Sequence, residues 1–202
     1  GRDAGPCVEE IEAGDIASQM IVETLQEISP PNDWDDFLNA VREGLQKVNQ
    51  QLREESAQRY QNRTIGSTVV VLLMWETQCA CLWVGDSRIY RLRGGHLQQL
   101  TRDHSHVQEL VDQGLILAAD AHRHPLANVI TRAVGSAEDL LVDEAIYPLE
   151  AGDMFLLCSD GLNKTVSDEE ITRLLTQSNH NCQEAVKAFI HLALMRDAND
   201  NV

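Results

Sequence analysis

The sequence predicts an α+β domain in which antiparallel sheets pack together with helices on the outside. Three observations support this prediction. Helical patterns occupy the beginning and the end of the chain, and strand-like apolar runs lie between them. One long connection, which does not show the strand pattern, separates the earlier runs from the later ones. A chain of 202 residues can bury a substantial core, so we expect a single domain.

The first part of the chain predicts two helices. Residues 1–12 show no hydrophobic period, and we expect them to form an irregular lead-in. From Ala13, apolar residues recur at helical spacing until the two prolines at 30–31. Asn32 or Asp33 can cap a second helix, whose apolar residues form one stripe: Phe37, Leu38, Val41, Leu45, Val48 and Leu52.

The strand-like runs predict sheets that are largely antiparallel, because short turns join neighbouring runs. The last third then predicts two helices, the first opened by a capping box at 167–170. The expected strands cover residues 68–75, 79–84, 89–93, 96–101, 140–147 and 153–158.

Two of these runs end in a small residue followed by a carboxylate. Asp86 follows Gly85 after the second run, and Asp160 lies between Ser159 and Gly161 after the last one. Such a pattern points an acid out of the end of a sheet, and the small neighbours let an ion, water or backbone approach; Gly161 would also permit a turn. With Asp200 as a third acid, oxygen ligands favour Mg²⁺ or Mn²⁺ over zinc.

Each acid also has a simpler interpretation. An aspartate at a strand end, followed by serine or glycine, is most often a turn former whose side chain bonds its own backbone. For any one of the three alone, this interpretation is the more common. Their joint occurrence favours the metal site.

Composition excludes several classes of partner. The net charge is −16, from 32 acids and 16 bases, which argues against nucleic acid and anionic membrane as partners. The sequence shows neither a membrane-spanning apolar run nor a signal pattern, so we expect a cytoplasmic protein. Five cysteines, an odd number, indicate reduced thiols rather than a disulfide framework, and Cys79 and Cys81 are expected to be ordinary buried strand residues.

The connection from 102 to 135 is much longer than a turn requires, and loops of this kind are usually functional flaps. It contains a short amphipathic helix that ends at Gly114. Four histidines in this flap suggest zinc, but their spacing matches no zinc signature and histidines are common on exposed flaps, so we do not predict a zinc site. These residues are His104, His106, His122 and His124.

Eight stretches together resemble the metal-dependent type 2C protein phosphatases, the PPM family, and in particular its bacterial members. They follow the family order with family-like gaps from about Glu12 to the last residue, so the set is far more specific than any one motif. The stretches are EAGDIAS at 12–18, GST at 66–68, VGDSR at 84–88, LTRDHS at 100–105, HP at 124–125, ITRAVG at 130–135, LCSDGL at 157–162 and DN at 200–201.

This resemblance implies a four-layer α/β/β/α sandwich, with two central antiparallel sheets flanked by helices and a flap subdomain at 102–135. It also implies a protein serine/threonine phosphatase that hydrolyses phosphoserine and phosphothreonine with a metal-activated water, using two or three Mn²⁺ or Mg²⁺ ions. Asp160 and Asp200 resemble ligands of the catalytic pair of ions, with Gly161 beside them, and Asp86 resembles the ligand of a third, weaker ion. Phosphorylated proteins are the implied partners, from a bacterial serine/threonine kinase or its substrates.

The chain also departs from the family pattern. The family's phosphate-binding arginine motif and its metal-bridging Asp-Gly-Met-Gly-Gly-His motif have no counterpart in residues 1–11, and the family continues beyond Val202 into a further strand. We therefore expect residues 1–202 to be one phosphatase-like domain that lacks its N-terminal and C-terminal strands, as a piece of a working enzyme. The alternative is a phosphatase-like regulatory or binding module without turnover. The intact aspartate motifs favour the enzyme.

Overall fold

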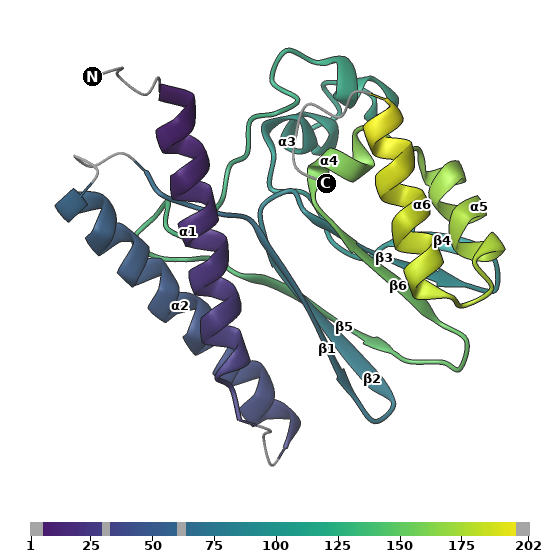
Figure 1. Cartoon of the computed structure of the whole chain (residues 1–202), viewed down its shortest axis with the longest axis horizontal. Helices are drawn as coiled ribbons and strands as arrows, with labels where there is room; N and C mark the ends of the chain where they lie inside the picture. Colours follow the sequence, from purple (N-terminus) through teal and green to yellow (C-terminus); the bar gives the residue numbers. More distant parts are fainter. Residues whose placement is uncertain (1–5, 30–32, 60–63, 197–202) are drawn as a thin grey trace.

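The computed structural model describes residues 6–29, 33–59 and 64–196, with side chains from residue 14 onward. In the described residues, two three-stranded antiparallel sheets lie face to face, and helices cover the outer face of each sheet (Figure 1). This arrangement confirms the predicted α+β sandwich. The first sheet contains β1 (Val69–Trp75), β2 (Gln78–Val84) and β5 (Asp143–Pro148); the second contains β3 (Arg88–Arg93), β4 (His96–Gln99) and β6 (Met154–Cys158).

The first sheet is covered by α1 (Pro6–Gln26) and α2 (Trp34–Arg59). The helix α1 begins at Pro6, so the expectation of an irregular lead-in through residue 12 is wrong from that residue onward. Proline is compatible with the first turn of a helix because its missing N–H has no intrahelical acceptor there. At α2, the Asp33 carboxylate accepts a hydrogen bond from the Asp36 N–H at 2.8 Å, which confirms Asp33 as a cap.

Three clusters of buried side chains fill the spaces between the four layers. Successive side chains of β2 point to opposite faces of the first sheet and so belong to two different clusters. Leu82 packs toward α1 and α2, whereas Cys81 and Trp83 pack toward the second sheet. The third cluster joins the outer face of the second sheet, including Tyr90, to the C-terminal helices α4 (Asp160–Asn163), α5 (Asp168–Gln177) and α6 (Cys182–Met195). Cys79 and Cys81 are therefore buried strand residues, as expected.

Most expected strand limits differ from the observed ones by one or two residues, and two departures are larger. The strand expected at 140–147 begins only at Asp143, because its partner β2 ends at Val84 and the last paired residues are Trp83 and Asp143. The sequence allowed a turn at Gly161, but this residue lies in the short helix α4, and the described glycines with positive φ do not include it. A four-residue helix is too short to produce a hydrophobic period in the sequence.

The long connection forms a folded flap above the second sheet, with α3 (His106–Asp112) and a 3₁₀ helix, η1 (Ala118–Arg123). Its two ends lie side by side, since the Thr131 N–H donates to the His104 carbonyl at 2.8 Å and the His106 N–H donates to the Val129 carbonyl at 2.9 Å. Within the described part of the chain, the structure contains no helix long and apolar enough to cross a membrane.

Candidate active site

Asp86 lies in the short link through which the chain passes from one sheet to the other. The link begins at Gly85, whose φ of +110° favours glycine, and a Cβ atom there would lie 2.3 Å from the Thr68 Cγ2 atom. At the other end of the link, the Ser87 hydroxyl group is hydrogen-bonded to the Thr68 hydroxyl group at 2.8 Å. This close packing holds Asp86 at the sheet edge with only 7% of its surface exposed.

Asp160 lies opposite Asp86 on the neighbouring strand connection. Strands β3 and β6 are antiparallel, and Arg88 pairs with Cys158. Asp86 and Asp160 each lie two residues beyond this last pair, Asp160 as the first residue of α4, and they are near enough for the charge of Asp160 to act on Asp86. The strand pairing therefore brings together the two acids that the sequence analysis proposed as metal ligands.

The two carboxylates form a site of concentrated negative charge. Burial, reinforced by the negative charge of Asp160, raises the pKa of Asp86 to about 6, whereas the ammonium group of Lys164 acts in the opposite direction. Both acids line a cavity of about 870 Å³ between the second sheet, the flap, and the α4–α5 region. A bound divalent cation would offset this charge, and carboxylate oxygens suit Mn²⁺ or Mg²⁺, so these residues fit the expected metal.

Of the other two predicted site residues, the structure describes Gly161 but not Asp200. Gly161 is buried in α4, and its carbonyl accepts a hydrogen bond from the Thr165 hydroxyl at 2.8 Å. Asp200 and its neighbour Asn201 lie outside the described residues. Within the described segments, the structure contains no group of three or more histidine, cysteine or acidic side chains suited to one metal ion.

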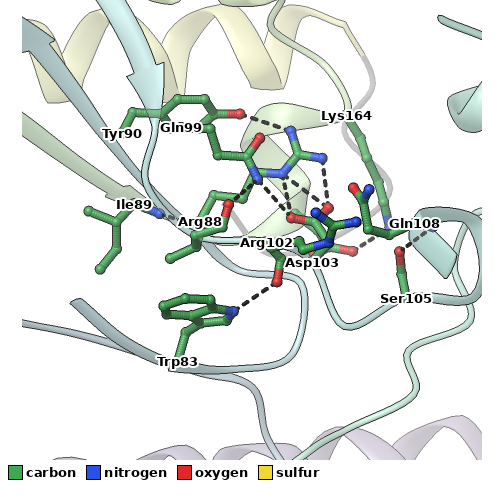
Figure 2. Close-up of polar contacts among 12 residues, drawn as sticks. Trp83, Arg88, Ile89, Tyr90, Gln99, Arg102, Asp103, Ser105, Gln108 and Lys164 are labelled. Atoms are coloured by element: carbon green, nitrogen blue, oxygen red, sulfur yellow. Dashed lines mark hydrogen bonds and ion pairs between the residues drawn. The ribbon is translucent and has the colours of Figure 1, made fainter. Parts of the chain in front are cut away.

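An ion pair in the cavity wall was not assigned by sequence reasoning. The Arg88 guanidinium donates two hydrogen bonds to the Asp103 carboxylate, Nε to Oδ1 at 2.9 Å and Nη2 to Oδ2 at 2.7 Å, and a third to the Tyr90 hydroxyl (Figure 2). Gln99 also donates to Asp103 at 3.0 Å. Both charged residues occur within the family-like motifs, but their pairing depends on strands that bring positions 15 residues apart together.

Of the flap histidines, His104 has a structural role. It is buried, stacks on Trp83, and accepts a hydrogen bond at Nδ1 from the Gly85 N–H at 3.0 Å. Burial lowers the pKa of His104, so the ring is neutral and its Nε2 carries the proton toward Asp143, 3.1 Å away. The base of the flap is thereby fastened to the link that carries Asp86.

Comparison with known proteins identifies the family of this chain. Residues 12–195 match the family model described as "Protein phosphatase 2C". The serine/threonine phosphatase stp of Listeria welshimeri is 34% identical over 194 residues, which cover 94% of this chain and 77% of the relative.

Solved structures agree with this assignment. PppA, described as a key regulatory component of T6SS in Pseudomonas aeruginosa, is 42% identical and superimposes with a TM-score of 0.83 over 100% of this chain and 78% of that protein. The catalytic domain of PstP in complex with two manganese ions is 31% identical, with a TM-score of 0.82, over 94% of this chain and 78% of that chain. The expectations of phosphatase activity and of Mn²⁺ or Mg²⁺ are thus confirmed: the chain belongs to the protein phosphatase 2C family, the metal-dependent protein serine/threonine phosphatases.

Proposed function

We propose that Asp160 and Asp200 are ligands of the catalytic metal ions of this phosphatase, with Gly161 beside Asp160, and that Asp86 binds a further, weaker ion. The observation that carries this proposal is the convergence of Asp86 and Asp160 at one edge of the sandwich, in the wall of a large cavity. Two close carboxylates of which one is buried are unfavourable without a cation. Ions bound there would activate a water for attack on phosphorus and offset the charge of the phosphate.

The chain's own residues would orient this chemistry. The packing of Gly85 against Thr68 and the hydrogen bond from Gly85 to His104 hold the backbone next to Asp86. The flap at 102–135 contributes Ser105, His122 and neighbouring residues to the cavity wall, which supports a role in covering the substrate groove. This rigid support would keep the ligands in place before the substrate enters.

The substrates are phosphorylated proteins, and we infer that a bacterial serine/threonine kinase, or the proteins that it phosphorylates, supplies them. We also infer a cytoplasmic location. The described cysteines are free, and both Cys79 and Cys81 are buried within the sandwich, which supports a reducing compartment.

The substitution Asp160→Asn tests the assignment of the metal ligand. Hydrolysis of p-nitrophenyl phosphate and of a phosphothreonine peptide is measured with added Mn²⁺ and again with a chelator. We expect kcat/KM of the variant to fall by more than about 100-fold, since the loss of a ligand charge removes several kcal/mol of transition-state stabilisation. Circular dichroism should remain unchanged, because the Asp160 side chain is partly exposed and pairs with the partly exposed Lys164.

Asp120→Asn is the matched control, since Asp120 is an exposed acid in η1 and does not line the cavity. It removes one negative charge from the flap and leaves Asp86 and Asp160 unchanged. An Asp160→Asn protein as active as the control would refute the ligand assignment. Activity of the unchanged protein that persists in chelator would refute the metal site.

A further inference from the structure

The cavity wall is strongly acidic, although a phosphatase must bind a phosphate dianion there. Bound metal ions would offset part of this charge, but the excess of acids makes every available positive side chain important. Six acidic side chains and three lysine or arginine side chains line the cavity in the described part of the chain: Asp86, Asp103, Asp160, Asp168, Glu169 and Glu170 against Arg88, Lys164 and Arg196.

The two arginines are already bound to carboxylates that no metal ion is expected to need. Arg88 makes a bidentate contact with Asp103, whose side chain is only 10% exposed. Arg196 donates to both carboxylate oxygens of Glu170, at 2.7 and 2.6 Å, and also to the Thr165 carbonyl at 2.8 Å. Paired guanidinium groups of this kind exchange partners only at the cost of an unpaired carboxylate.

Lys164 differs because its carboxylate partner is a proposed metal ligand. It follows α4 directly, and its ammonium group forms an ion pair with Asp160, four residues earlier. Figure 2 shows Lys164 in the same close-up as the Arg88–Asp103 pair. The Lys164 charge also acts on Asp86, so it lies near both acids. Its side chain is 35% exposed, and its long, flexible stem permits the ammonium group to move.

We propose that Lys164 exchanges partners when metal binds: its ammonium group pairs with Asp160 in the metal-free protein and contacts the phosphate group of the substrate in the metal-loaded protein. This inference rests on the proposed metal site. A cation that takes the Asp160 carboxylate removes the partner of Lys164 and leaves a mobile positive charge in the cavity. A phosphate oxygen is then the complementary ligand, and Lys164 is a substrate-binding residue that competes with metal for Asp160.

The proposal predicts opposite effects of one substitution on two ligands. Lys164→Met keeps an unbranched side chain only one atom shorter and removes its charge. Isothermal titration calorimetry should show Mn²⁺ binding tightened by about twofold to fivefold, the size of a partly exposed ion pair. The affinity of the Mn²⁺-loaded variant for phenylphosphonate, a mimic of a phosphate monoester that is not hydrolysed, should fall by about tenfold, as expected for loss of one charged hydrogen bond.

Lys47→Met is the control, because Lys47 is exposed on α2 and is absent from the cavity wall. It removes the same charge and should leave both affinities unchanged, whereas Lys164→Arg, which keeps the charge, should retain binding of phenylphosphonate. Identical affinities in Lys164→Met and Lys47→Met would overturn the proposal, as would Mn²⁺ binding weakened by Lys164→Met. Asp160→Asn separates the two levels of inference: if it leaves Mn²⁺ affinity unchanged, the metal site itself is wrong.

Discussion

Replacing Asp86 by asparagine should stabilise the metal-free protein at neutral pH while weakening its binding of Mn²⁺. The reason is that the wild-type carboxylate is nearly buried and lies near Asp160, so its charge is costly until a cation offsets it. The amide has almost the same shape and carries no charge. The substitution therefore separates the effect of the Asp86 charge on the free energy of unfolding from its effect on Mn²⁺ affinity.

The pKa of Asp86 sets the size of the effect. A pKa raised from 3.8 to about 6 is a difference of about two pKa units, or at most about 3 kcal/mol in the free energy of unfolding. Between pH values of about 4 and 6, the folded protein binds more protons than the unfolded chain. Wild-type stability from this group therefore falls as pH rises through that range, and the full cost of Asp86 is present at pH 8.

Urea unfolding and thermal melting at pH 5 and pH 8, in the presence of a chelator, measure this effect. We expect Asp86→Asn to raise the Tm at pH 8 by up to about 10 °C, with a smaller gain at pH 5. Added Mn²⁺ should stabilise the wild-type protein more than the variant. The exposed control Asp120→Asn should change neither quantity, and an Asp86→Asn protein less stable than wild type at pH 8 would refute the reasoning.

Three further substitutions test the support of the site, each by urea unfolding. Gly85→Ala should cost about 3 kcal/mol, since it forces an unfavourable φ and a clash with Thr68, and an unchanged midpoint would contradict the packing described. Arg88→Met should cost about 3 kcal/mol because it leaves Asp103 without its ionic partner; a loss below about 1 kcal/mol would mean that the pair is solvated. Ser167→Ala should cost about 1 kcal/mol through loss of the α5 cap, and a neutral result would show that the capping box contributes nothing.

Much of the fold could be predicted from local patterns. The apolar stripe of α2 and the capping box of α5 occur as predicted, because helix periodicity and capping depend on residues only three or four positions apart. Strand limits were less certain, since a strand ends where its partner ends. The late start of β5 at Asp143 illustrates this dependence on β2.

The sequence by itself determined the fold class, the family and the candidate acids Asp86 and Asp160, because periodicity, chain order and motif chemistry are properties of local residues. Only the tertiary structure decided which charges meet. The pairing of β3 with β6 brings Asp86 near Asp160 and its local partner Lys164. The fold also pairs Arg88 with Asp103. Coulomb energy and desolvation depend on distance and burial, and neither can be read from positions along a chain.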